Sequence, residues 1–170
     1  MKNLLPKSKN FEGGFFFLPA KKCNNRSFCQ GVGGVSQLWP SGAGLAGIGA
    51  DIIEIERIRR AAERSNCRFL ERVFTTAERD YCDAKRDRYA CYAARFAAKE
   101  AVLKAMGRGL SGCRWSDVEI RRADEGRPEV HLHGRAAEMA KERGIGQVLV
   151  SLSHDKRRAL AFAVAVREEA

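Results

Sequence analysis

The sequence predicts a single α+β domain in which a mainly antiparallel sheet packs against a long central helix. Three observations predict this fold class. The alanine-rich segment 88–106 has the length and composition of a helix. Two apolar runs near the C-terminus, 147–153 and 159–166, have the length of neighbouring strands. Strands and helices do not alternate one by one along the chain, so a regular βαβ series is excluded.

The domain is expected to begin at residue 46 and to run to residue 170. Before residue 46, glycines interrupt any helical or strand periodicity of apolar residues. Residues 47–53 form an apolar run that predicts a short buried strand leading into a helix over 51–64. That helix should bury one apolar stripe at helical spacing and expose arginines on the other side. The stripe consists of Ile55, Ile58 and Ala62.

A second apolar stripe, Phe69 to Phe74, precedes the pair Thr75 and Glu78. Threonine followed three residues later by glutamate is typical of a capping box at a helix start. The central helix is then expected to stop at the glycines that follow Met106.

The remaining elements follow from turn residues between apolar runs. Residues 118–120 and 130–132 flank Asp124-Glu125-Gly126, which predicts a hairpin. Residues 135–143 form a short helix closed by Gly144. The two C-terminal strands complete the order strand, helices, hairpin, helix and strand pair.

Composition narrows the class of protein. The chain has 170 residues, 31 Lys and Arg, 21 Asp and Glu, and a net charge of +10. No apolar run approaches the ~18 residues of a membrane-spanning helix, so we expect no membrane protein. Half of the net charge lies in residues 1–45, which leaves the domain only mildly basic and weakens a nucleic-acid-binding interpretation.

Residues 1–45 form a basic, glycine-rich extension unlike the rest of the chain. We expect it to be disordered or to reflect a start site assigned too far upstream. A transit peptide is the alternative, although the segment has one arginine and no clear amphipathic repeat.

The six cysteines include no C-x-x-C pair. Their spacing supports neither a zinc site nor a disulfide framework. We therefore expect reduced thiols and a cytoplasmic protein.

Three polar positions interrupt apolar segments. Asp51 ends the first strand, where it is either a helix N-cap or a ligand for a hard cation such as Mg²⁺. Glu100 and Lys104 share one face of the central helix, which is either a surface ion pair or part of a site. The alanines around them allow another backbone or a ligand to come close; they are Ala97, Ala98, Ala101 and Ala105.

The segment Ser151-Leu152-Ser153-His154-Asp155 ends the strand before last. Hydroxyl groups alternating along a strand and followed by histidine are compatible with a phosphate or nucleotide contact. Ser153 and Asp155 are equally compatible with a turn into the last strand.

Taken together, three segments resemble the holo-acyl-carrier-protein synthase family of 4′-phosphopantetheinyl transferases. They are Gly47-Ile48-Gly49-Ala50-Asp51-Ile52-Ile53-Glu54, Arg95-Phe96-Ala97-Ala98-Lys99-Glu100-Ala101 and Ser151-Leu152-Ser153-His154-Asp155. Their order and spacing agree with the family over essentially all of residues 46–167, and the middle segment is the most specific. Residues 1–45 have no counterpart in the family's short form.

The resemblance implies the 4′-phosphopantetheinyl transferase fold and a transfer reaction that supports fatty acid biosynthesis. The phosphopantetheine arm of coenzyme A moves to a serine of apo-acyl carrier protein and releases adenosine 3′,5′-bisphosphate. It further implies that Asp51 and Glu100 hold Mg²⁺ against the pyrophosphate and that Lys104 acts near the leaving phosphate. Lys99, Ser153 and His154 are expected to bind coenzyme A, and the family's homotrimer places each active site between subunits.

Under this interpretation, the basic face of the first predicted helix is expected to bind the acyl carrier protein. Arg57, Arg60 and Arg64 lie opposite the apolar stripe, and complementary charge would steer a small acidic carrier protein to the site. A merely solvated face is the alternative, and Arg57 is favoured because it matches a family arginine.

Two other function classes compete with the enzyme. A nucleic-acid-binding module explains the basic charge but leaves Asp51 and Glu100 without a role, and it lacks aromatic stacking platforms. A catalytically silent trimeric scaffold is disfavoured because Asp51, Glu100 and Lys104 are all present.

Overall fold

The computed structural model describes residues 44–107, 112–123 and 126–168. The extension expected over 1–45 lies outside these residues except for its last two positions, and Leu45 already begins the first strand.

Within the described residues, five strands form two antiparallel sheets, in agreement with the α+β prediction. The larger sheet has the order β1-β5-β4, built from β1 (Leu45–Glu54), β5 (Arg158–Arg167) and β4 (Ile145–His154). The smaller sheet is the predicted hairpin of β2 (Val118–Arg122) and β3 (Pro128–Leu132). The predicted turn at residues 124–125 lies outside the described residues.

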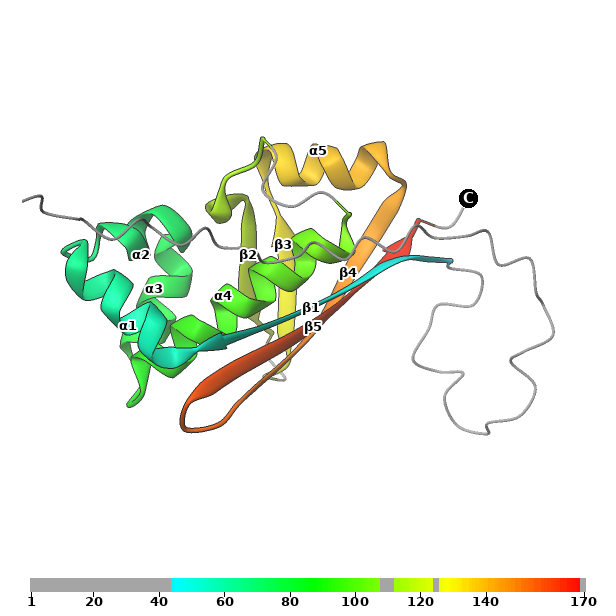
Figure 1. Ribbon diagram of the computed structural model, residues 1–170. Helices are drawn as coiled ribbons and strands as arrows, with labels where there is room; N and C mark the ends of the chain where they lie inside the picture. Colours follow the sequence, from blue (N-terminus) through cyan, green and yellow to red (C-terminus); the bar gives the residue numbers. More distant parts are fainter. Residues whose placement is uncertain (1–43, 108–111, 124–125, 169–170) are drawn as a thin grey trace, which may run out of the picture.

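The longest helix, α4, lies along one face of the larger sheet, while three shorter helices gather near the end where β1 leaves it (Figure 1). The helices are α1 (Ile55–Arg64), α2 (Arg68–Val73), α3 (Thr76–Asp83), α4 (Arg88–Ala105) and α5 (Gly134–Glu142), with a 3₁₀ turn over Trp115–Asp117. None of the helices in this described part of the chain is long and apolar enough to cross a membrane.

The predicted helix signals hold in the structure with one exception. The Thr75 hydroxyl accepts from the Glu78 amide at 3.3 Å, and the Thr75 amide donates to the Glu78 carboxylate at 2.9 Å, which confirms the capping box. The helix expected over 51–64 begins only at Ile55. Asp51 therefore lies inside β1, and its interpretation as a helix N-cap is wrong.

The inner face of the sheet is built from small residues, and this lets α4 come very close. A Cβ at Gly47 would overlap the carbonyl oxygen of Ala105, and one at Gly49 would overlap that of Ala101. On β5 the inward positions are alanines with at most 1% exposure. The alanines of α4 therefore accommodate another backbone, that of β1.

We expect Gly49→Ala to destabilise the protein by about 1–3 kcal/mol, because the added methyl group must push β1 away from α4. The melting temperature of the variant measures this cost, once circular dichroism has shown that its secondary structure is retained. Gly44→Ala is the matched control, since a Cβ there meets only the Arg167 side chain at 3.4 Å. Equal melting temperatures for the two variants would contradict the close approach.

The outer face of the same sheet exposes large apolar side chains. Ile48, Ile52 and Phe162 are 67%, 57% and 55% exposed, and Leu149 is 36% exposed. The strand register sets all four on one face, because positions two apart on a strand point the same way. Contiguous exposed apolar residues of this kind mark an interaction surface.

Candidate functional site

The close contact between β1 and α4 brings two oppositely charged side chains together. Asp51 lies on the inner face of β1, and Lys104 lies in the last turn of α4. The Lys104 ammonium donates to the Asp51 carboxylate at 2.7 Å and to the Ala50 carbonyl at 3.1 Å. The Lys104 side chain is 38% exposed, so this ion pair is open to solvent and to a ligand.

Glu100 lies one turn before Lys104 on α4 and joins this group. The pKa of the Glu100 carboxyl is raised, first by burial and then by the negative charge of Asp51, against the opposing effect of Lys104. The two carboxylates are thus close enough to repel one another. Lys104 pairs with Asp51, so the surface ion pair considered between Glu100 and Lys104 does not form.

This pair of carboxylates fits a hard divalent cation. Asp51 and Glu100 supply only oxygen donors, and a cation between them would relieve the repulsion that raises the pKa of Glu100. Within the described ranges no group of three or more His, Cys, Asp or Glu side chains converges. Two protein ligands suit Mg²⁺, which usually keeps several positions for waters and phosphate oxygens.

Lys99 does not reach this site. Its ammonium is wholly buried, where it pairs with Glu78 at 2.8 Å and donates to the backbone carbonyls of Trp115 and Val118. Neighbouring positions on a helix point about 100° apart, so Lys99 faces inward when Glu100 faces β1. The expected contact of Lys99 with coenzyme A therefore does not fit the structure. Instead, this side chain links α4 to α3 and to the start of β2.

The Ser153 segment also lies apart from Asp51 within one chain. Ser153 stands opposite Leu160, which stands opposite Ile52, so Ser153 belongs to the outer face of the sheet. His154 is exposed at the end of β4. The Asp155 carboxylate accepts from the amides of Arg157 and Arg158 at 2.7 and 2.6 Å, which confirms its alternative role in the turn.

The predicted basic face lies on α1, beside the strand that carries Asp51. Arg57, Arg60 and Arg64 are exposed, while Ile55, Ile58 and Ala62 are buried as the stripe predicted. Arg60 donates to Glu56 at 3.0 Å, so part of the positive charge on this face is compensated.

A second polar cluster surrounds Glu119 on β2. Its carboxylate, almost fully buried, accepts from the Thr75 hydroxyl at 2.9 Å and contacts His133 and Arg121 at 2.8 and 2.9 Å. Burial alone would raise the pKa of Glu119, but these hydrogen bonds lower it to about 2. The sequence offered one signal for this residue, a carboxylate between two apolar residues of a predicted strand, Val118 and Ile120.

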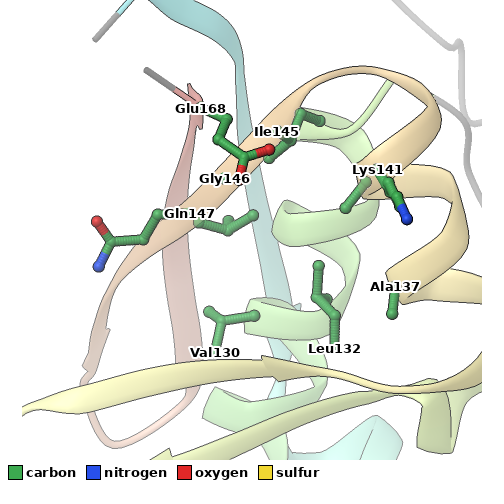
Figure 2. A pocket seen from close by; sticks show the side chains of 10 residues that line it. Val130, Leu132, Ala137, Lys141, Ile145, Gly146, Gln147 and Glu168 are labelled. Atoms are coloured by element: carbon green, nitrogen blue, oxygen red, sulfur yellow. The ribbon is translucent and has the colours of Figure 1, made fainter. Parts of the chain in front are cut away.

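A cavity of about 390 Å³ lies between β3, α5 and the start of β4 (Figure 2). Val130, Leu132 and Ile145 give it an apolar wall, and Lys141 and Glu168 add charged groups to its lining. None of the site residues expected from the sequence lines it. Asp51, Glu100 and Lys104 lie instead at the junction of β1 and α4, outside this cavity.

Comparisons with known proteins agree on one family. The model of the 4′-phosphopantetheinyl transferase superfamily matches residues 47–163. The holo-[acyl-carrier-protein] synthase of Desulforudis audaxviator is 57% identical over 122 residues, which cover 72% of this chain and 93% of that protein. The crystal structure of holo-ACP-synthase from Plasmodium yoelii has a TM-score of 0.67 at 34% identity and covers 75% of this chain and 98% of its own.

A further solved structure carries a ligand. The holo-[acyl-carrier-protein] synthase of Helicobacter pylori in complex with coenzyme A has a TM-score of 0.62 at 31% identity, covering 69% of this chain and 98% of that chain. All three matched proteins carry the name holo-[acyl-carrier-protein] synthase, and the two solved structures share the fold of this chain.

Proposed function

The chain belongs to the 4′-phosphopantetheinyl transferase superfamily, and we propose that it acts as a holo-[acyl-carrier-protein] synthase. It transfers 4′-phosphopantetheine from coenzyme A to a serine of apo-acyl carrier protein and releases adenosine 3′,5′-bisphosphate. One structural observation supports this reaction. Asp51, Glu100 and Lys104, which come from two distant segments, meet where β1 touches α4.

The reaction is a phosphoryl transfer. The serine oxygen of the carrier protein bonds to the phosphorus that bears pantetheine, the bond from that phosphorus to the bisphosphate oxygen breaks, and the serine proton is lost. Such transfers need little covalent chemistry from the protein and depend on positioning and on neutralising charge. The nucleophile belongs to the carrier protein.

Asp51 and Glu100 would hold Mg²⁺. When bound there, the ion would supply positive charge to the pyrophosphate oxygens of coenzyme A. The two carboxylates come from separate elements, so the contact of β1 with α4 sets their spacing. The Asp51–Lys104 ion pair keeps the Asp51 carboxylate turned toward α4.

Lys104 is suited to stabilise the negative charge of the leaving group. Its ammonium, 38% exposed, sits beside the carboxylates and carries the charge that the departing phosphate requires. A lysine at this position would donate a hydrogen bond or a proton to the bisphosphate oxygen as the bond breaks.

The basic face of α1 is proposed to receive the carrier protein. We expect Arg57→Glu to raise the Michaelis constant for apo-acyl carrier protein about tenfold or more, because reversed charge opposes encounter with an acidic partner. Coenzyme A affinity should not change. The matched control is Arg86→Glu, an exposed arginine between α3 and α4. Steady-state kinetics with each substrate varied would contradict this role if Arg57→Glu behaved like the control.

A homotrimer is proposed through the outer face of the larger sheet. The exposed Ile48, Ile52 and Phe162 supply the apolar area that a stable subunit interface requires. Ser153 lies on this same face, so in an assembly it would lie near a neighbouring subunit. This supports active sites completed by Ser153 and His154 of an adjacent chain. We further propose that the protein is cytoplasmic and that it supports fatty acid biosynthesis.

The function is tested by the nucleotide product. With coenzyme A, apo-acyl carrier protein and Mg²⁺, chromatography should show adenosine 3′,5′-bisphosphate formed in proportion to carrier protein consumed. Carrier protein whose acceptor serine is replaced by alanine is the control. Release that continues with the alanine form would point to hydrolysis of coenzyme A and overturn the transfer reaction.

A further inference from the structure

Two cysteine sulfur atoms lie side by side where α3 meets α4. Cys82 is in the last turn of α3 and Cys91 in the first turn of α4. The Cys82 thiol donates to the Cys91 sulfur, and the two Sγ atoms are 2.7 Å apart. Both are free thiols; Cys82 has no exposed surface, whereas Cys91 is partly exposed. A small oxidant can therefore reach Cys91 before it reaches Cys82.

A buried arginine marks Cys91 as the anionic member of the pair. Arg95 is only 6% exposed, and its Nη1 donates to the Cys91 sulfur at 2.9 Å. The Tyr81 ring, 4.2 Å from the guanidinium carbon, holds Arg95 in place. Among the described residues no carboxylate forms an ion pair with Arg95. Because a nearby negative charge stabilises a buried guanidinium, Arg95 favours the thiolate form of Cys91 over the thiol.

The two thiols differ in reactivity for the same reasons. The pKa of Cys91 is lowered, first by the hydrogen bond from Cys82 and further by Arg95, against the opposing effect of burial. The pKa of Cys82 is raised by that hydrogen bond and by burial. Because the thiolate is the nucleophile, Cys91 reacts first and Cys82 follows.

We propose that Cys91 and Cys82 are a peroxide-oxidised site that closes to an intramolecular disulfide. The Cys91 thiolate attacks one oxygen of a hydroperoxide, the O–O bond breaks, and the other oxygen leaves as hydroxide or alkoxide, which takes a proton from solvent. The Cys82 sulfur then attacks the Cys91 sulfenic acid, and the hydroxyl group leaves with the Cys82 proton as a second water. Two thiols are oxidised by two electrons in total, and the peroxide is reduced by two.

The bond joins α3 to the helix that carries Glu100 and Lys104. It closes a short loop over the α3–α4 turn, which restricts the unfolded chain. The oxidised protein should therefore melt at a higher temperature than the reduced protein. This inference does not depend on the proposed transferase activity.

Peptide mapping of the full chain tests the site. Reduced protein is treated with a few equivalents of hydrogen peroxide, alkylated, and digested with trypsin without reductant. Cleavage after Lys85, Arg86 and Arg88 separates the two cysteines. We expect peptide 80–85 linked to peptide 89–95, with a loss of about 2 Da that dithiothreitol restores. Cys67 and Cys113 serve as internal controls and should remain alkylated thiols.

Variants test the order of events. Cys82→Ser should accumulate a sulfenic acid on Cys91 that dimedone traps, whereas Cys91→Ser should leave Cys82 a thiol over the same time. Arg95→Met, checked for folding by circular dichroism, should slow cross-linking several-fold. Alkylated thiols at both positions after peroxide, a bond to a different cysteine, or sulfinic acid in place of the disulfide would each overturn the proposal. Equal oxidation of Cys82 in Cys91→Ser would overturn the assigned order.

Discussion

Asp51→Asn is expected to lower kcat/KM for carrier-protein modification by roughly 10²-fold or more, the scale of losing one fixed charge at a reacting phosphate. The amide keeps the size of the carboxylate but loses its charge toward Mg²⁺ and toward Lys104. Glu100→Gln should have a similar effect, because Glu100 is the second oxygen donor of the pair.

Folding should survive these substitutions. The Asp51–Lys104 ion pair is partly exposed, so its loss costs about 1 kcal/mol or less. Glu54→Gln is the matched control, since Glu54 is an exposed carboxylate at the end of the same strand and makes no side-chain cap to α1. The role of each carboxylate is refuted if the folded variant turns over as fast as Glu54→Gln at all Mg²⁺ concentrations.

Lys99→Met is expected to cost about 3–5 kcal/mol of stability, because it breaks a buried ion pair. The substitution leaves the Glu78 carboxylate buried at 2% exposure without its cation, and the carbonyls of Trp115 and Val118 lose a donor. Burial lowers the pKa of Lys99, and Glu78 opposes that shift, so the two charges depend on each other.

Denaturant unfolding measures this loss of stability, and two further variants serve as comparisons. Adding Glu78→Gln to Lys99→Met should recover part of the stability, because no unpaired charge then stays buried. Lys104→Met makes the same substitution five positions on, at a partly exposed side chain. It should change stability by less than about 1 kcal/mol but abolish turnover. Identical unfolding curves for Lys99→Met and Lys104→Met would contradict the division of roles.

Local signals in the sequence were sufficient for most of the fold. The capping box at Thr75, the alanine-rich helix and the hairpin depend on residues near one another in the chain, and the structure confirms them. The start of α1 was misjudged because the apolar run of β1 continues into the apolar stripe of the helix without a breaking residue. Only pairing with β5 through Glu54 extends the strand that far.

The candidate site was predictable in part. Asp51, Glu100 and Lys104 were identified by motif, and their meeting depends on Gly47 and Gly49, which let β1 reach α4. Lys99 was expected to bind coenzyme A, but it adjoins Glu100 on α4, and adjacent helix positions face different directions.

Contacts between segments distant in the chain could not be predicted from the sequence. Glu119 and His133 belong to β2 and the start of α5, and their contact requires the hairpin to fold back. Cys82 and Cys91 match no cysteine motif, and only the packing of α3 on α4 brings their sulfur atoms together.

The most direct test of the transferase is the intact mass of apo-acyl carrier protein after incubation with this protein, coenzyme A and Mg²⁺. We expect a gain of one phosphopantetheinyl group with the parent protein, and no gain when Mg²⁺ is chelated or when Asp51→Asn is used. An unchanged mass with folded enzyme and several carrier proteins would contradict it.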